Sequence, residues 1–328
     1  MERTNDHRQP PLGKIARLYY EHGLTHQEIA DLCGLSRIKV TRLLAEARRV
    51  GIVEITVHSD DHLFVGLESA LGRAYPLRQA WVGPTFEDEA RAAHSLGAVA
   101  AECVSALLED RATVAVGLSA SVATIPRHLR PGAARDVNFV PLTGSGGGIS
   151  RAASSHELAL AFAAGAGGHA YHLPAPLLAR TPQAAQVWRE DPAVQETLER
   201  AVSADVLVAG IGGRTGLLVE NLSASDLAAT RGRGAVGDIS GRFFDANGAA
   251  VPCEVDDRLI GLSLAQLRAV PVRIGVARGA AKLQALRVAL SQGLINVLVT
   301  DSSTAEGLLA AAGADAPAGA PASAEASS

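Results

Sequence analysis

The sequence predicts an α/β protein in two parts, a small helical head followed by an open sheet that is mostly parallel. In the head, apolar residues recur at helical spacing and are flanked by residues typical of helix caps. After residue 78, short apolar runs alternate with amphipathic segments, and each run breaks into a loop rich in Gly, Ser or Asp. Strands buried in parallel sheets read as such runs, so the alternation favours an α/β sheet.

The head is expected to form a winged helix-turn-helix. Thr25 can cap one helix with Glu28 completing a capping box, Gly34 allows a tight turn, and Ser36 caps a second helix. The residues expected to face inward are Ile29, Ala30 and Leu32 in the first helix and Val40, Leu43, Leu44 and Ala47 in the second. Residues 14–19 supply a preceding helix, and residues 51–57 alternate like a strand and would form the wing.

A helix-turn-helix presents the start of its second helix to the major groove of DNA. The candidate DNA-binding residues are Thr25, Gln27, Ser36, Arg37, Lys39, Thr41 and Arg42. The alternative is a structural helical hairpin whose arginines are merely solvated. The turn glycine, both caps and the basic face agree with one another, which favours DNA binding.

Charge divides the chain in the same way. Up to Gly51 there are nine Lys or Arg and six Asp or Glu, so the head carries +3 and the other 277 residues carry −7 of the total −4. A basic head on an acidic body is drawn to phosphate only at the head, and binding should weaken with salt. Because +3 holds DNA weakly, we expect two or more heads on one operator and hence a homo-oligomer, a dimer or a tetramer.

Length and composition suit a head and one large domain. The 328 residues are 48% hydrophobic but 4% aromatic, so the core is expected to consist of Ala, Val, Leu and Ile. Cys33, Cys103 and Cys253 are widely spaced and expected to be free thiols. With neither an apolar leader nor a membrane span, we expect a cytoplasmic protein. The expected divisions are 1–57 for DNA, 58–312 for ligand binding and oligomerisation, and 313–328 for a disordered tail.

The body is expected to alternate strands with helices. The expected strands are residues 79–82, 113–116, 137–140, 170–173, 206–209, 272–276 and 297–300. The expected helices are residues 63–75, 90–108, a segment ending near 129, 157–164 and one that follows 282. Ligands bind at the carboxyl ends of strands in such sheets, so the loops that follow the strands form the candidate site.

Three of those loops can be given physical roles. Gly117, Ser119 and Ser121 offer backbone N–H groups and hydroxyls between a strand and a helix, which suits a phosphate. The Gly210–Gly213 loop, with Gly212 at its centre, lets the backbone approach a ligand closely. Lys282 lies in the first turn of a helix, where a cation is unfavourable unless it meets an anion. Each loop alone also fits a tight turn, but their convergence at one edge favours a ligand site.

Two long stretches carry a resemblance to a known family. They are Gln27-Glu-Ile-Ala with Leu35-Ser-Arg-Ile-Lys-Val-Thr-Arg-Leu-Leu in the head, and Gly234-Ala-Val-Gly-Asp-Ile-Ser-Gly-Arg-Phe-Phe-Asp with Pro271-Val-Arg-Ile-Gly-Val-Ala-Arg-Gly-Ala-Ala-Lys in the body. With Leu173-Pro-Ala-Pro between them, the chain from about residue 12 to 312 resembles the SorC-type sugar-binding transcriptional regulators, which are related to the DeoR-like repressors.

The resemblance implies a ligand domain similar in fold to ribose-5-phosphate isomerase and glucosamine-6-phosphate deaminase, which binds a sugar or sugar phosphate as an effector. It implies that Asp238 and Asp257 accept hydrogen bonds from sugar hydroxyls and that Lys282 is the cationic partner of a phosphate or of an anionic sugar oxygen. The Gly117 loop departs from the family pattern, with Ala120 to Ala123 in place of a second glycine and a threonine. An unphosphorylated polyol is therefore the other expected effector.

Other interpretations of these residues remain open at this stage. Asp238 could be a turn aspartate that bonds its own backbone. Asp238, Asp257 and Lys282 could instead serve a sugar-phosphate isomerase or deaminase fused to the head. A nicotinamide cofactor would need a Gly-x-Gly-x-x-Gly motif after an early strand, which this chain lacks. No cofactor and no metal site is expected, and a non-enzymatic regulator, a repressor or an activator, explains the head best.

Overall fold

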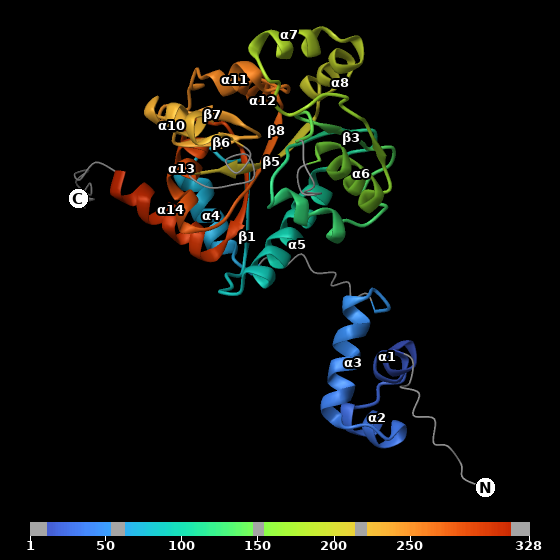
Figure 1. Ribbon diagram of the computed structural model, residues 1–328. Coiled ribbons are helices and arrows are strands. Elements are labelled where there is room, and N and C mark those ends of the chain that lie inside the picture. The colour runs from blue at the N-terminus through green and yellow to red at the C-terminus, as the bar shows by residue number, and fades with distance from the viewer. Residues whose placement is uncertain (1–11, 54–62, 147–153, 214–221, 316–328) are drawn as a thin grey trace, which may run out of the picture. The chain divides into compact units, whose positions relative to one another are not determined.

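The computed structural model describes residues 12–53, 63–146, 154–213 and 222–315, and the chain divides into two compact units, Met1–Asp61 and His62–Ser328 (Figure 1). The smaller unit holds α1 (Leu12–Tyr20), α2 (His26–Cys33) and α3 (Arg37–Arg49). Both predicted caps are present. Thr25 and Glu28 form a complete capping box, Gly34 is left-handed with φ 65°, and the Ser36 hydroxyl accepts from the Lys39 N–H at 3.2 Å.

The apolar faces of the three helices form the core of the smaller unit. Its buried members are Ile15, Ile29, Ala30, Val40, Leu43 and Leu44. The expectation for Leu32 is wrong, because its side chain is 65% exposed. In α2 the inward face is centred on Ile29, Ala30 and Cys33, and Leu32 projects to one side of it. Residues 51–53 form a turn and a bend, and 54–57 lie outside the described residues, so the wing stays a prediction.

The larger unit is built on a sheet of seven parallel strands in the order β1-β9-β8-β5-β2-β3-β4. Their bounds are β1 Gln79–Gly83, β2 Thr113–Val116, β3 Asn138–Pro141, β4 His169–Ala170, β5 Val206–Gly212, β8 Val272–Val276 and β9 Val297–Asp301. The far end of β5 pairs in antiparallel fashion with β6 (Gly237–Ile239), which forms a hairpin with β7 (Arg242–Phe244). The predicted open, mostly parallel sheet is confirmed.

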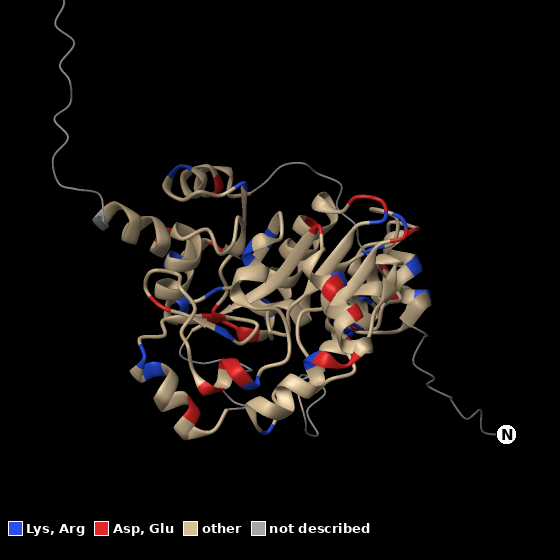
Figure 2. Ribbon diagram, turned by 90° about the horizontal axis from the view of Figure 1, so that it is seen from above, with Lys and Arg blue, Asp and Glu red and all other residues tan. Residues whose placement is uncertain are grey.

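Helices cover both faces of the sheet (Figure 1). On one face lie α4 (Val65–Ala74), α13 (Leu283–Ser291) and α14 (Ser302–Asp315), and on the other lie α5 (Glu89–Leu107), α6 (Ser155–Ala166) and the 3₁₀ helices η1 (Val122–Thr124) and η2 (Pro126–His128). Alternate residues of β5 divide between two cores, with Leu207 packed on the first face and Val208 on the second. Figure 2 shows few charged residues in the strands, while acidic and basic residues are interspersed over the outer helices and loops.

The remaining helices surround one end of the sheet. They are α7 (Pro182–Glu190), α8 (Pro192–Val202), α10 (Ala224–Gly232), α11 (Glu254–Arg258) and α12 (Leu264–Ala269). Leu264 and Leu267 of α12 and Ala201 of α8 belong to the core of the first face. Two smaller apolar clusters, one around Leu173 and Ile260 and one around Phe243 and Val251, hold α7, α10, α11 and the start of α8. Among the helices of the described ranges, none combines the length and apolar character that a membrane-spanning helix needs.

Four expectations need correction. Strand β5 continues through Gly210 to Gly212, where a loop was expected, because its end pairs with β6. Strand β4 has two residues instead of four. The segment ending near 129 forms η1 and η2, since Pro126 has no N–H to continue an α-helix. Helix α14 reaches Asp315, so the first residues of the expected tail are helical, while 316–328 lie outside the described residues.

The strand order places a topological switch between β2 and β5. From β2 the chain proceeds outward to β3 and β4, whereas from β5 it proceeds the other way to β8 and β9. Loops that follow adjacent strands at such a point diverge to opposite sides of the sheet and leave a crevice where ligands bind. The predicted loop after β2 and the glycines at the end of β5 lie at this point.

Candidate functional site

The proposed DNA-binding surface lies at the start of α3. Arg37 and Arg42 are exposed, Lys39 is half-buried, and Ile38 between them is 68% exposed. Val40 and Leu43 on the opposite face are buried in the core of the head. The basic side chains are thus displayed by a helix whose other face is fixed by packing, as recognition by a helix in the major groove requires.

Several of the other predicted DNA-binding residues are engaged within the head. The Gln27 side-chain amide donates to Asp31 at 2.9 Å, and the Thr41 hydroxyl donates to the Arg37 carbonyl at 3.1 Å. The Thr41 hydroxyl also lies 3.3 Å from His26 Nδ1. Thr25 and Ser36 act as caps, and their hydroxyls accept from the backbone N–H groups of Glu28 and Lys39.

The ligand-site residues predicted around the switch point come together through close approaches to glycine. A Cβ added to Gly212 would lie 1.8 Å from Asp238 Oδ1, and one added to Gly210 would lie 2.3 Å from Ser119 Oγ. A Cβ on Gly213 would lie 3.7 Å from Lys282 Cγ. Glycine at the end of β5 therefore makes room for groups from the loop after β2, from β6 and from the loop after β8.

Asp238 is a buried carboxylate on β6. Its Oδ2 accepts a hydrogen bond from the Gly241 N–H at 3.1 Å, so it does act as a turn aspartate. Burial raises the pKa of Asp238 to about 6, although the Gly241 N–H and the charge of Lys282 both favour the carboxylate. A buried carboxylate with this pKa gains free energy from any hydroxyl that donates to it.

Lys282 ends the 3₁₀ helix η4 (Ala280–Lys282), directly before α13. Burial lowers the pKa of Lys282 from its ordinary value, whereas the negative charge of Asp238 raises it. Arg278 on the same loop forms an ion pair with Glu89 at 2.5 Å, and these two charges act on Lys282 with opposite signs. The site thus holds an ammonium group whose burial leaves it in need of an anionic partner.

The loop after β2 is built differently from the prediction. The Ser119 hydroxyl accepts from the Val122 N–H at 3.1 Å, which leaves its proton available for a ligand. The half-exposed Ser121 opens η1, a three-residue 3₁₀ helix. An anion at this loop therefore lacks the dipole of a long α-helix, which had supported the prediction.

Asp257 lies elsewhere. It is exposed on α11, and its carbonyl accepts from Arg189 of α7 at 2.8 Å. Among the described residues, none of its contacts reaches Asp238 or Lys282. The structure therefore brings Gly117, Ser119, Gly212, Asp238 and Lys282 to one place and leaves Asp257 apart from them.

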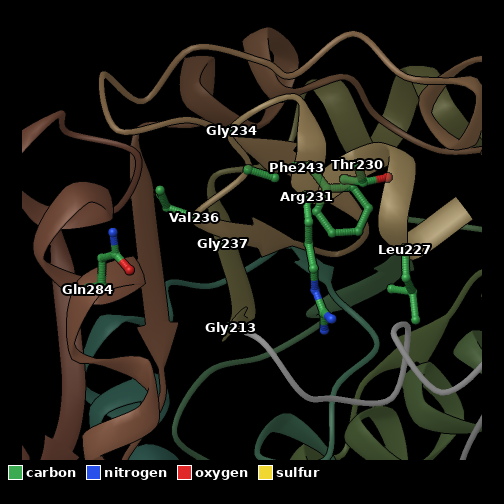
Figure 3. A pocket seen from close by; sticks show the side chains of 10 residues that line it. Gly213, Leu227, Thr230, Arg231, Gly234, Val236, Gly237, Phe243 and Gln284 are labelled. Atoms are coloured by element: carbon green, nitrogen blue, oxygen red, sulfur yellow. The ribbon is translucent and has the colours of Figure 1, made fainter. Parts of the chain in front are cut away.

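A cavity of about 360 Å³ opens beside this cluster, between the β6–β7 hairpin, α10 and the start of α13 (Figure 3). Gly213 and Gly237 line it on the side of Asp238, and Gln284 and Phe243 lie across from each other. Arg231 extends along it beside the Phe243 ring (Figure 3). Its size suits a small polar molecule such as a sugar.

The sequence did not single out three of the residues gathered here. Arg231 and Gln284 lie on helices whose sequences carry no ligand motif, so their part in the cavity depends on tertiary packing. Ser240 packs against Gly117, where an added Cβ would lie 2.3 Å from its hydroxyl oxygen. The Ser240-Gly241 dipeptide marks a turn in general, but nothing in the local sequence indicates that its serine packs against Gly117.

Comparisons with known proteins identify the family of each part of the chain. The family model of the sugar-binding domain matches residues 63–310, and that of the crp family of bacterial regulatory proteins matches residues 23–52. The chain is 33% identical over 306 residues to the transcriptional regulator LsrR of Escherichia coli K12, covering 91% of this chain and 94% of the relative. It is 30% identical over 309 residues to LsrR of Klebsiella pneumoniae, covering 92% and 93%.

Solved structures show the same architecture. The full-length sorbitol operon regulator SorC from Klebsiella pneumoniae matches with a TM-score of 0.72 and 27% identity, covering 91% of this chain and 97% of that one. The sugar-binding domain of a transcriptional repressor from Vibrio fischeri matches with a TM-score of 0.70 and 25% identity, covering 76% and 99%. The chain belongs to the SorC-type family of sugar-binding transcriptional regulators.

Proposed function

We propose that this protein binds an operator through the start of α3 and that a sugar phosphate bound at the β2–β5 switch point sets its affinity for that operator. One observation carries the proposal: Ser119, Asp238 and Lys282 approach the glycines at the end of β5. Such a ligand requires a carboxylate to bind its sugar hydroxyls and an ammonium group, here half-buried, to bind its phosphate.

The charges of the site favour a phosphorylated ligand over a free polyol. Lys282 is held in surroundings that lower its pKa, so a phosphate nearby would restore the free energy that its burial costs. Arg278 on the same loop adds a second cation, whose partner Glu89 has a side chain that is 85% exposed. An exposed carboxylate is a weak partner, which leaves Arg278 able to turn to an anionic ligand.

In this proposal, binding to the operator requires the heads of more than one subunit. The operator would be read by a homo-oligomer, a dimer or a tetramer, in the cytoplasm, and the ligand would act by changing how the subunits present their heads. Such control requires the ligand to bind the operator-competent and operator-incompetent arrangements with different affinity.

An enzyme is the second candidate, and Asp238 is the observation that favours it. A buried carboxylate with a pKa of about 6 is suited to general base catalysis on a sugar phosphate. The fold that the family resemblance implies also occurs in sugar-phosphate isomerases. Control of transcription explains both the ligand site and the helix-turn-helix head, whereas an enzyme explains only the ligand site. We therefore retain control of transcription as the conclusion.

The test is titration calorimetry of the full chain with three pairs of probes: ribose 5-phosphate and ribose, glucosamine 6-phosphate and glucosamine, sorbitol 6-phosphate and sorbitol. We expect at least one phosphorylated member to bind at least about tenfold more tightly than its free partner. Lys282→Met should abolish that preference, whereas Lys14→Met in the head should preserve it. Absence of binding by all six probes would overturn the proposal, and turnover of any of them would establish the enzyme instead.

A further inference from the structure

The turn between β6 and β7 carries an unfavourable residue at its first position. The two turn residues, Ser240 and Gly241, have φ of 49° and 87°. A two-residue hairpin turn with both φ positive favours Asn-Gly, Asp-Gly or Gly-Gly, because other side chains crowd the backbone in that conformation. Serine is none of these, so the requirements of the turn do not explain why it is here.

The side chain of Ser240 adds a second cost. Its hydroxyl oxygen is buried and has no hydrogen-bond partner among the residues that the structure describes. A buried hydroxyl without a partner lowers the stability of the folded state, and replacing serine by glycine would remove both this cost and the strain at φ 49°. The structure therefore retains at this turn a hydroxyl that destabilises it.

The position of this hydroxyl indicates what it serves. It lies against Gly117, the first residue after β2, and the same hairpin carries Asp238 two residues earlier. Asp238 Oδ2 is taken by the Gly241 N–H, while Oδ1 is directed at Gly212. One carboxylate oxygen and one hydroxyl of a single hairpin thus lie buried against Gly212 and Gly117, at the switch point of the sheet.

We propose that Ser240 is a specificity-determining residue of the ligand site, whose hydroxyl bonds a hydroxyl group of the sugar that Asp238 also binds. The inference rests on the proposed function. It adds a residue that recognises the sugar part of the ligand, whereas Lys282 recognises its phosphate. Asp238 accepts from a sugar hydroxyl, and Ser240 either donates to that oxygen or accepts from its neighbour on the ring or chain. Ligand binding then satisfies the Ser240 hydroxyl.

The test compares Ser240→Gly and Ser240→Ala with the unaltered chain, using thermal unfolding and calorimetry with the six sugar probes. We expect Ser240→Gly to raise Tm by about 2 °C, because strain and the unpartnered hydroxyl are both removed. For the sugar that binds the unaltered chain, both variants should weaken binding about fivefold to tenfold, the loss of one hydrogen bond. Their preference for the phosphorylated member of the pair should be retained.

Asp136→Gly is the matched control. Asp136 is exposed, lies outside the site and has a positive φ of 55°. It should gain Tm for the same backbone reason and leave sugar binding unchanged. Unchanged sugar binding in Ser240→Gly would overturn the inference and leave the proposed function standing. A fall in Tm in Ser240→Gly would overturn it too, since the hydroxyl would then be structural. No binding of any probe to the unaltered chain would overturn the proposed function, and this inference with it.

Discussion

The start of α3 and the carboxyl end of β5 are both recognition surfaces, but they are built in opposite ways. On α3 the basic side chains are exposed, and the buried face of the helix holds them in place. At the end of β5 Asp238 is buried and Lys282 is half-buried, glycines make room for them, and both have pKa values displaced against their charged forms.

This difference in burial determines how each surface affects the stability of the folded protein. Exposed arginines cost the folded protein little, so altering them should change DNA binding and leave stability alone. Buried charges and an unpartnered hydroxyl lower the stability of the free protein, and a ligand that satisfies them recovers that free energy as affinity. The two surfaces should therefore respond differently to substitution.

The largest expected effect is at Gly212. In Gly212→Ala the new methyl group would lie 1.8 Å from Asp238 Oδ1, so the β6 strand must shift. We expect a loss of about 3 kcal/mol in the free energy of unfolding by urea, together with loss of sugar binding. Gly72→Ala on an open face of α4 is the control and should gain up to about 1 kcal/mol. Equal stability of the two variants would show that the end of β5 is not closely packed.

The substitution Asp238→Asn should show how much the buried charge of Asp238 lowers the stability of the fold. The folded-state pKa of about 6 lies above the ordinary 3.8, so the folded state holds the proton more tightly than the unfolded state. The stability that this provides is complete below pH 3.8 and is lost as the pH rises through about 6. The variant should thus be more stable than the unaltered chain by up to about 3 kcal/mol at pH 8, and the two should be equally stable near pH 4.

Urea unfolding at both pH values measures this difference, and using the difference cancels other groups such as His128, whose pKa burial lowers to about 4. Sugar binding should be lost in Asp238→Asn at pH 8. A constant difference between the two proteins across this range would mean that Asp238 does not titrate where its burial implies.

Substitutions at the start of α3 should have the smallest effect on stability, although they should clearly weaken operator binding. Arg37→Ala and Arg42→Ala should each weaken operator binding by about 1 to 2 kcal/mol, and change the free energy of unfolding by less than about 0.5 kcal/mol. The sugar-induced rise in Tm should persist. Arg48→Ala, exposed near the other end of the same helix, is the control. If Arg48→Ala weakened binding as much, the contact surface would not be the start of α3.

Much of the fold could be predicted because its signals are local. Buried strands such as β2 and β9 each contain a run of three apolar residues, and the caps at Thr25 and Ser36 lie beside the helices they begin. The helices α7 and α8 carried comparable signals, since Thr181 and Asp191 cap them and each is followed by proline, and these were missed.

The candidate site was less predictable because its contacts are long-range. Glycines at the end of β5 suggested a loop, yet the strand continues because β6, formed by residues much later in the chain, pairs with it. Ser240 could not be recognised as a site residue because it packs against Gly117, which lies far away in the sequence in the loop after β2. For Asp257, resemblance supplied a role, whereas the helix α11 places it at the surface beside Arg189.

The most direct test of control by a sugar is a DNA-binding titration of the full chain with and without the sugar phosphate that binds it. The duplex would be selected from a random pool by the protein itself and its binding followed by fluorescence anisotropy. We expect the sugar phosphate to change the apparent Kd for DNA at least about tenfold in the unaltered chain, and to leave it unchanged in Lys282→Met. An equal change in both proteins, or none in either, would contradict control of the head from the β2–β5 switch point.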